Sequence, residues 1–332
     1  MKAWLLDSQT GLGALRLGDA PDPAPAPGQV VLEILFAALN PADRYHAEGQ
    51  YPAHPPMPHI LGRDGLGVVI AAAANTTIPL GSKMLILRGE TGVSAPGTFA
   101  QKTAVSVESL VPVPPGWTDQ QAAGAPLVYL TAWQALTHWP DLPTPSVVLV
   151  TGASGGVGVA AVQLAKAMGH TTIALSRSPA KRTQLLTLGA DFALDGSTPG
   201  WPRQLRDTLA GRRVDLAIDN IGGEQFPQLI ETLGDRGRVS IVGRLAGPVP
   251  QFNTSSLIFR RLRIGGVAVG AYTAPESRAA WQQIIPLLSA ANARLLVDSV
   301  FAFDELPKAF ERLAAGPMGK VLLAVSGSAQ MV

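Results

Sequence analysis

The feature that most constrains this chain is a glycine-rich turn placed between an apolar strand and a helix. The segment Val147–Gly158 reads VVLVTGASGGVG and continues into the helical sequence VAAVQLA. This order delivers a helix N-terminus, with its free N–H groups and partial positive charge, to a bound pyrophosphate. Gly155 lets the backbone approach the phosphate, and Gly158 lets the helix pack closely on the strand. We therefore expect a dinucleotide site that includes Ala153, Ser154, Gly155, Gly156, Val157 and Gly158.

The residues around this turn alternate strands and helices, which indicates a parallel sheet with right-handed crossovers. We expect strands over 146–152, 171–178, 214–220, 238–242 and 263–269, and helices over 156–168, 179–188 and 224–233. Ligands of such sheets bind beyond the carboxyl ends of the strands. Asn220 and the pair Val242-Gly243 stand at two of these ends, so we include them in the predicted cofactor site.

The segments on either side of this strand–helix alternation differ from it in composition and pattern. Before residue 119, Pro and Gly separate short apolar runs, which predicts a β-rich domain with long loops. After residue 269, mixed helices and strands could return to complete that domain. We predict an α/β chain in which a β-rich domain, residues 1–118 and 270–332, is interrupted by a Rossmann domain, residues 119–269.

The end of the second expected strand distinguishes the two nicotinamide cofactors. NAD enzymes usually carry Asp or Glu there to hold the ribose 2′-hydroxyl group. This chain has Ser176 and Arg177 instead, with Lys181 one turn later. A 2′-phosphate would meet two cations and a hydroxyl group, so the predicted cofactor is NADP(H).

A short-chain dehydrogenase shares the pattern T-G-x-x-x-G-x-G of this turn, but it also needs a later Tyr-x-x-x-Lys pair. Downstream of the turn the only tyrosine is Tyr272, and Glu276 stands four residues on. That class is therefore excluded.

The chain has no cysteine, so it can form no disulfide, thiolate nucleophile or cysteine-ligated zinc site. His46, His54 and His59 are close in sequence, but the prolines among them indicate an irregular loop, and we expect no metal there. The net charge is +2 and no basic stripe is present, so we expect no nucleic-acid partner. No apolar run is long enough for a membrane span and no leader is evident, so we expect a cytoplasmic protein.

Several motifs, taken together, resemble the zinc-free quinone oxidoreductase and enoyl reductase branch of the medium-chain dehydrogenase/reductase superfamily. They are N-P-A-D at 40–43, L-G-R-D-G-L-G-V-V at 61–69, L-T-A-W-Q-A-L at 130–136, the glycine turn, N-I-G-G at 220–223 and G-K-V at 319–321. The resemblance implies a GroES-like catalytic domain interrupted by the Rossmann domain. Zinc-containing relatives carry Gly-His-Glu where this chain has Gly62-Arg63-Asp64, and a cysteine near Asn40.

The resemblance also implies roles for individual residues. Asn40 and Thr131 would lie beside the nicotinamide, and Tyr51 would donate a hydrogen bond to the substrate, with Tyr45 in the same pocket. Lys320 would approach the cofactor or the substrate. Asp43 and Asp64 we expect to be structural, capping or bracing the cleft. NADPH would supply a hydride to a small quinone or α,β-unsaturated carbonyl compound.

Two other functions stay open at this point: an enoyl thioester reductase, and a non-catalytic NADPH-binding protein similar to ζ-crystallin. A homodimer formed by edge pairing of the strand over 263–269 is a further expectation from the resemblance.

Overall fold

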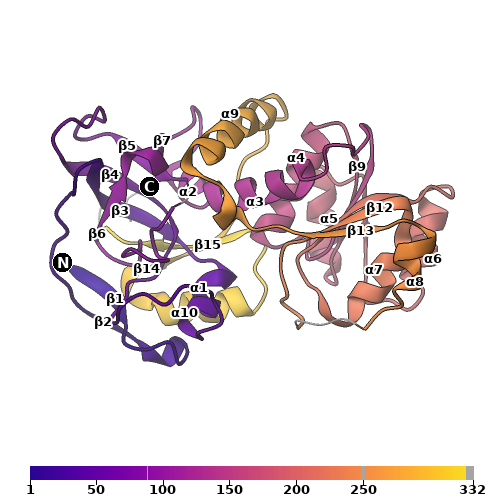
Figure 1. Cartoon of the computed structure of the whole chain (residues 1–332), viewed down its shortest axis with the longest axis horizontal. Coiled ribbons are helices and arrows are strands. Elements are labelled where there is room, and N and C mark those ends of the chain that lie inside the picture. The colour runs from indigo at the N-terminus through magenta and orange to yellow at the C-terminus, as the bar shows by residue number, and fades with distance from the viewer. Residues whose placement is uncertain (88, 248–250, 327–332) are drawn as a thin grey trace. The chain divides into compact units, whose positions relative to one another are not determined.

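The computed structural model describes residues 1–87, 89–247 and 251–326, which form two compact units (Figure 1). The first unit takes its residues from 1–127, from 270–281 and from 294 onward. The second consists of 128–269 and 282–293. The sequence predicts domain boundaries at 118/119 and 269/270. These boundaries stay a proposal for how the chain divides into domains.

The first unit is built on a seven-stranded sheet with the strand order β14-β15-β3-β4-β5-β7, and β6 pairs with β3. The strands are β3 (Gln29–Ala38), β4 (Asp64–Ala72), β5 (Lys83–Ile86), β6 (Lys102–Ser106), β7 (Leu110–Pro112), β14 (Val297–Ala302) and β15 (Lys320–Ala324). The ten-residue β3 is central, because β15, β4 and β6 all pair with it in antiparallel register. Two strands from the end of the chain thus complete a sheet begun near its start. A separate hairpin joins β1 (Lys2–Leu6) to β2 (Leu15–Asp19).

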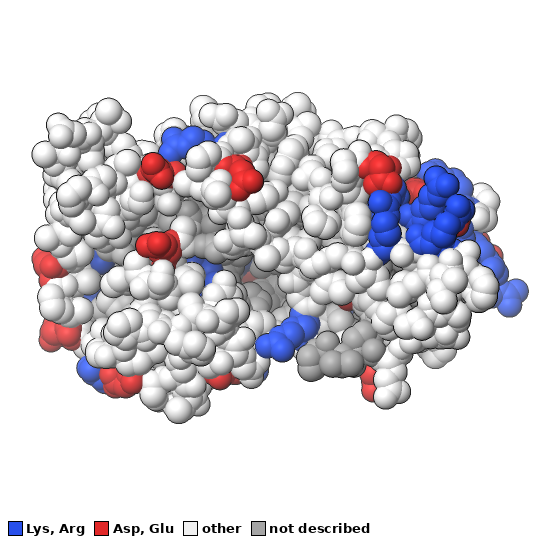
Figure 2. Space-filling model, viewed as in Figure 1, with Lys and Arg blue, Asp and Glu red and all other residues white. Residues whose placement is uncertain are grey.

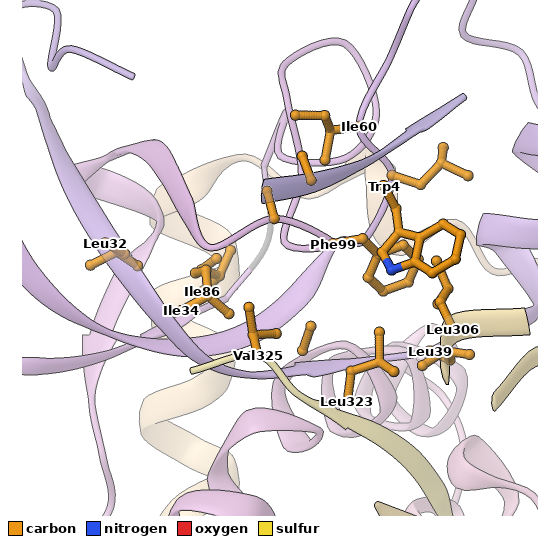
Figure 3. Close-up of a cluster of buried hydrophobic side chains, with 14 of the residues drawn as sticks. Trp4, Leu32, Ile34, Leu39, Ile60, Ile86, Phe99, Leu306, Leu323 and Val325 are labelled. Atoms are coloured by element: carbon orange, nitrogen blue, oxygen red, sulfur yellow. The ribbon is translucent and has the colours of Figure 1, made fainter. Parts of the chain in front are cut away.

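The core of the first unit combines side chains from both ends of the chain (Figure 3). Trp4 lies in β1, and its indole N–H donates to the carbonyl oxygen of Phe303 over 2.8 Å, which satisfies the polar atom of a buried aromatic residue. Phe99 packs edge-on against Phe310 of α10 (Leu306–Ala314), with ring centroids 6.0 Å apart. Leu32, Ile34, Leu39, Ile60, Ile86, Leu306, Leu323 and Val325 belong to the same cluster.

Two short helices of this unit begin at capping boxes. In α1 (Pro41–Ala47) Asn40 is the N-cap, Asp43 accepts from the Asn40 backbone N–H, and proline occupies the first turn. In α2 (Asp119–Ala123) Thr118 and Gln121 cap reciprocally. Both patterns satisfy N–H groups that a helix start otherwise leaves unpaired. Two longer helices, α3 (Ala125–Thr137) and α9 (Ala274–Ala290), have residues in both units.

The second unit contains a six-stranded parallel sheet in the order β10-β9-β8-β11-β12-β13. Its strands are β8 (Val147–Val150), β9 (Thr171–Leu175), β10 (Phe192–Leu194), β11 (Val214–Asp219), β12 (Leu233–Ile241) and β13 (Arg263–Gly266). Its helices are α4 (Gly156–Ala167), α5 (Pro179–Thr187), α6 (Trp201–Thr208), α7 (Phe226–Thr232) and α8 (Ser255–Phe259). The sequence order runs outward in both directions from β8, which is the doubly wound Rossmann arrangement. The expected α/β fold class, a GroES-like sheet with a Rossmann sheet, is confirmed.

Some element boundaries differ from those expected. The strand expected over 263–269 ends at Gly266, because Val269–Ala271 turns into a 3-10 helix. Strand β12 begins at Leu233 rather than at residue 238. Its pairing with β11 shifts register there, and Arg236 has a left-handed φ of 56°. Such an irregular start has no period-two signal in the sequence.

Lys and Arg side chains gather at one place on the face that Figure 2 shows, over the part of the second unit where β12 and β13 lie. Among the ion pairs of the second unit, Arg261 pairs with Asp235, and both Arg238 and Arg263 pair with Asp141. Across the residues that the structure describes, no helix combines the length and apolarity needed to cross a membrane.

Candidate active site

The glycine turn has the geometry of a phosphate cradle. Gly155 is the N-cap of α4, with φ −74° and ψ 170°, and it has no side chain to accept the N–H groups of the first helical turn. These groups therefore face a ligand or solvent. A Cβ atom on Gly158 would lie 2.3 Å from the carbonyl oxygen of Gly152 and 2.6 Å from the Cα of Ala153, so glycine is required there. A Cβ on Gly155 would meet only the Gly152 oxygen, at 3.5 Å. The protein's own packing does not require glycine at 155, which fits a ligand approaching that atom closely.

A hydrogen-bonded network joins the carboxyl ends of β8 and β11. The Thr151 hydroxyl donates to Asp219 Oδ1 over 2.7 Å and accepts from the backbone N–H of Asn220 over 3.0 Å. The Asn220 side-chain amide donates to the Thr151 carbonyl oxygen over 2.8 Å. A Cβ on Gly243 would lie 2.6 Å from the Asn220 carbonyl oxygen, and the Val242 N–H donates to Asp219 O. The structure thus brings Asn220, Val242 and Gly243 together, braced by Thr151 and Asp219, which sequence reasoning missed.

Beyond β9, the polar residues expected to face a 2′-phosphate lie around the start of α5. Arg177 is exposed, whereas Ser176 and Lys181 are half-buried. The Ser178 hydroxyl caps the helix by accepting from the Lys181 N–H over 3.4 Å.

Two neighbours were not foreseen from the sequence. Arg182 donates to the carbonyl oxygens of Ser176 and Arg177 over 2.9 and 3.0 Å, and reaches Asp195 Oδ2 at 3.4 Å. Hydrogen bonds from Ser197 hold the pKa of Asp195 below its ordinary value, and the charges of Arg182 and Arg177 add to this effect. The basic cluster therefore has an acidic neighbour from beyond β10, distant in sequence.

In the first unit, Asn40 belongs to a buried network with Asp64 and Lys320, none of which is more than 3% exposed. The Asn40 amide donates to Asp64 Oδ2 over 3.0 Å and to the Ala38 carbonyl oxygen over 3.3 Å. Lys320 Nζ donates to Asn40 Oδ1 (2.7 Å), Asp64 Oδ2 (3.1 Å) and the Leu39 carbonyl oxygen (3.0 Å). All three ammonium hydrogens are directed at protein oxygens, so within this unit Lys320 braces Asn40. Its expected contact with cofactor or substrate stays a prediction.

Charge in this network is tightly balanced. Burial raises the pKa of Asp64, while the Lys320 ammonium and the Asn40 amide oppose that rise. The Asp64 carboxylate also accepts from the Leu127 N–H at 3.3 Å. With three such donors, the ionised carboxylate is stabilised away from water. This agrees with the structural role expected for Asp64.

Tyr51 lies in the loop after α1, beside a buried ion pair. Arg63 Nε donates to Asp43 Oδ1 over 2.9 Å, and the Arg63 side chain is only 5% exposed. The guanidinium carbon lies 4.6 Å from the Tyr51 ring centroid. His46 stacks on Tyr51 with ring centroids 5.5 Å apart. Tyr45, in α1, is half-buried like Tyr51. In the sequence analysis Arg63 stood out only because it occupies the position of a metal ligand in zinc-containing relatives.

The three histidines of this region do not converge. His46 and His59 are buried with ring centroids 5.4 Å apart, whereas the exposed His54 contacts Gln9. Burial and the neighbouring His46 lower the pKa of His59 to about 4. Within the described ranges, no group of three or more His, Asp or Glu side chains is placed to hold a metal.

Thr131 lies buried in α3 and belongs to the second unit, while Asn40 and Tyr51 belong to the first. That these three residues meet beside a nicotinamide therefore stays a prediction.

Two family models match the chain. The model described as alcohol dehydrogenase GroES-like domain matches residues 26–115, and that described as zinc-binding dehydrogenase matches residues 156–290. The quinone oxidoreductase of Pseudomonas aeruginosa is 28% identical over 295 residues, covering 88% of this chain and 89% of that protein. A component of the phenolphthiocerol/phthiocerol polyketide synthase of Mycobacterium tuberculosis is 28% identical over 240 residues, which are 72% of this chain but 11% of that protein.

Solved structures agree over nearly the whole chain. An NAD-dependent alcohol dehydrogenase matches with a TM-score of 0.89 and 27% identity, covering 98% of this chain and 100% of that one. A mycobacterial protein in complex with NADPH matches with a TM-score of 0.87 and 25% identity over the same shares. The two matched domains and the quinone oxidoreductase relatives confirm the resemblance seen in the motifs. The chain belongs to the medium-chain dehydrogenase/reductase superfamily and is an oxidoreductase of its quinone oxidoreductase branch.

Proposed function

We propose that the chain binds NADP(H) on its second unit and uses it, without zinc, to reduce a quinone or an α,β-unsaturated carbonyl compound. The observation that carries the proposal is the first turn of α4. It follows Gly155, which provides no capping side chain, and it lies at the carboxyl edge of a parallel sheet. The exposed Arg177, with Lys181 at the start of α5, supports NADP(H) over NAD(H). The relative named quinone oxidoreductase supports the choice of acceptor.

NADPH supplies the hydride when bound. The N–H groups at the start of α4 would hold its pyrophosphate, and Arg177 and Lys181 would neutralise its 2′-phosphate. Asn40, fixed by Lys320 and Asp64, and Thr131 would orient the nicotinamide. Tyr51 would donate a hydrogen bond to the acceptor oxygen as negative charge develops there, with Tyr45 lining the same pocket.

Zinc independence is supported by the chemistry of the residues present. The chain has no cysteine, and Arg63 stands where zinc-containing relatives carry a histidine ligand. Arginine offers five donors and no lone pair to a metal, and this one already pairs with Asp43. We expect dialysis against 1,10-phenanthroline to leave kcat unchanged. A loss of activity that added Zn²⁺ restores would contradict this part of the proposal.

The test of the reaction is NADPH oxidation with three acceptors: 1,4-benzoquinone, a simple enone and crotonyl-CoA. We expect turnover with benzoquinone or the enone, and a lower rate with NADH than with NADPH. Tight NADPH binding without turnover of any acceptor would instead favour a non-catalytic NADPH-binding protein.

The second candidate is an enoyl thioester reductase. The match to a polyketide synthase over 72% of the chain favours it. Turnover of crotonyl-CoA at a higher kcat/KM than that of the free enone would establish this candidate over the first.

We also propose a cytoplasmic homodimer. Strand β13 is the outer strand of the six-stranded sheet, so its second edge is available for pairing with a copy of itself. Light scattering at several protein concentrations tests this, and a monomer mass at all of them would contradict it.

A further inference from the structure

Arg63 is a buried cation whose hydrogen-bonding capacity is only partly used by its ion pair. Its Nε donates to Asp43 Oδ1 over 2.9 Å, and its Nη2 donates to the Ala42 carbonyl oxygen over 3.2 Å. The other oxygen of Asp43 accepts from the Asn40 backbone N–H over 2.9 Å. Asp43 is thus shared between the cap of α1 and Arg63, and the pair is not the two-pronged contact that arginine and carboxylate usually form.

The remaining part of the guanidinium is turned to Tyr51. Its central carbon lies 4.6 Å from the Tyr51 ring centroid, within the range of a cation–π interaction. Burial alone would lower the pKa of Arg63. The Asp43 carboxylate and the Tyr51 side chain, which also shares a hydrogen bond with the guanidinium, outweigh burial and raise that pKa. The phenol and the cation are therefore electrostatically coupled.

Tyr51 depends on such contacts for its orientation. It follows Gly49, whose φ is +68°, and precedes a stretch of prolines without helix or strand. His46 stacks on its ring with an interplanar angle of 22°. His46 belongs to α1 and Arg63 directly precedes β4, so two residues anchored to regular elements contact an otherwise irregular loop residue.

We infer that Arg63 is a positioning residue that acts through Tyr51: it orients the phenol and strengthens the hydrogen bond that its O–H donates to the acceptor oxygen. This inference rests on the role proposed for Tyr51. A positive charge beside the ring draws electron density away from the phenol O–H and makes it a stronger donor, so the donated hydrogen bond tightens as negative charge develops on the acceptor during hydride addition.

The experiment is a double-mutant cycle in the full-length protein with Y51F, R63Q and the double variant. The measured quantities are kcat and KM for the enone or quinone, Kd for NADPH, and Tm. We expect Y51F and R63Q each to lower kcat by roughly tenfold to a hundredfold, with Kd for NADPH unchanged. In the Y51F background, R63Q should lower kcat by no more than about twofold, because the hydroxyl through which Arg63 acts is already gone.

The matched control is R238Q. Arg238 is also 5% exposed and pairs with an aspartate, Asp141, but it lies in β12 of the second unit. R238Q should lower Tm as R63Q does while leaving kcat within about twofold of wild type. If R63Q does not fold, R63K keeps the charge beside Asp43 but lacks the planar fork, and it takes the place of R63Q in the cycle.

The outcomes separate the inference from the proposed function. If the effects of Y51F and R63Q on kcat multiply, or if R63Q weakens NADPH binding, Arg63 does not act through Tyr51 and the inference is overturned while the role of Tyr51 stands. If Y51F alone keeps the wild-type kcat, the proposed role of Tyr51 fails first, and the inference fails with it.

Discussion

Nearly all hydrogen-bonding groups of the Asn40 side-chain amide have partners within the protein. Both amide hydrogens are donated, to Ala38 and Asp64, and one lone pair of its oxygen accepts from Lys320. The oxygen Oδ1 is therefore the part of the side-chain amide that can still contact a ligand. Asn40 can therefore act on a nicotinamide or an acceptor only by accepting a hydrogen bond, from an orientation fixed by two neighbouring charges.

This arrangement predicts a large effect of K320M. The substitution leaves the Asp64 carboxylate buried without its cation and releases the Asn40 oxygen. We expect the free energy of unfolding to fall by about 3 to 5 kcal/mol and kcat to fall with it. Urea unfolding measures the first and steady-state kinetics the second. The double variant D64N/K320M, which buries no charge, should recover part of the stability.

K83M is the control for K320M, because the Lys83–Asp119 pair is solvent-exposed and such pairs contribute about 1 kcal/mol or less. A loss of stability in K320M no greater than that in K83M would show that the buried network contributes little.

At the cofactor end, Arg177 is the exposed residue on which the choice between NADPH and NADH should depend. We expect R177S to weaken NADPH binding by roughly tenfold to a hundredfold and to leave NADH binding nearly unchanged, because only NADPH carries the 2′-phosphate. D195N should strengthen NADPH binding, since it removes a carboxylate beside the cluster. Fluorescence titration measures both. Equal weakening of NADH and NADPH by R177S would rule out this role.

At the scale of elements, the strand–turn–helix unit of β8 and α4 is the part of the fold that depends most on single atoms. Gly155 and Gly158 lie three residues apart on the same turn but are constrained by different things. Gly158 is surrounded by backbone atoms of the turn, which cannot yield to a side chain. The protein leaves room for a methyl group on Gly155, and only a bound ligand would fill that space.

This difference predicts a separation between G158A and G155A. We expect G158A to lower stability by about 1 to 3 kcal/mol and to abolish NADPH binding, because the turn must shift to admit a Cβ. G155A should keep a wild-type Tm while weakening NADPH binding, because its methyl group occupies the space that a phosphate would approach. Thermal unfolding with and without NADPH tests both. A G155A variant that binds NADPH normally would place the phosphate elsewhere.

The elements that the sequence predicted well are those with strong apolar periodicity or turn residues. The strands at Val147–Val150 and Val214–Asp219 and the helix at Gly156–Ala167 lie within about two residues of their expected bounds. Helix α6 was not foreseen, because it buries only Trp201 and Leu205 and is otherwise polar. The short β10 also lacks a distinct pattern, since Leu194 is its only buried residue.

The sequence predicted which residues belong to the candidate site, but not which of them contact one another. Asn40, Tyr51 and the glycine turn came from motifs. The Arg63–Tyr51 contact, the Lys320–Asn40 bond and the nearness of Asp195 to Arg177 each join residues from different elements. Tertiary pairing of this kind leaves no periodic trace in one sequence, so the structure had to supply it.

At the scale of the whole molecule, buried imidazoles should make stability depend on pH. The pKa of His59 is lowered from 6.5 to about 4, and burial likewise lowers the pKa values of His46 and His170. Between about pH 6.5 and pH 4 the unfolded chain therefore binds more protons than the folded protein, so stability falls as the pH falls through this window. His59 alone accounts for about 3 kcal/mol near pH 4.

We expect urea-unfolding midpoints to decline from about pH 7 to about pH 4, and H59Q to flatten this decline. H138Q, which removes an exposed imidazole, should leave it unchanged. An unaltered slope in H59Q would show that His59 is not buried as a neutral ring.

The pairing of β15 with β3 has a consequence for synthesis on the ribosome. Phe36–Ala38 are made long before their partners, Leu322–Ala324, which leave the exit tunnel only after all of the intervening chain has been made. Until then the backbone groups of Phe36–Ala38 on this edge of β3 are open, although β6 can already pair further along the same edge and β4 along the opposite one. The nascent protein therefore has an incomplete GroES-like sheet until Leu322–Ala324 have been made. During that interval it is most exposed to edge-to-edge aggregation and most dependent on chaperones.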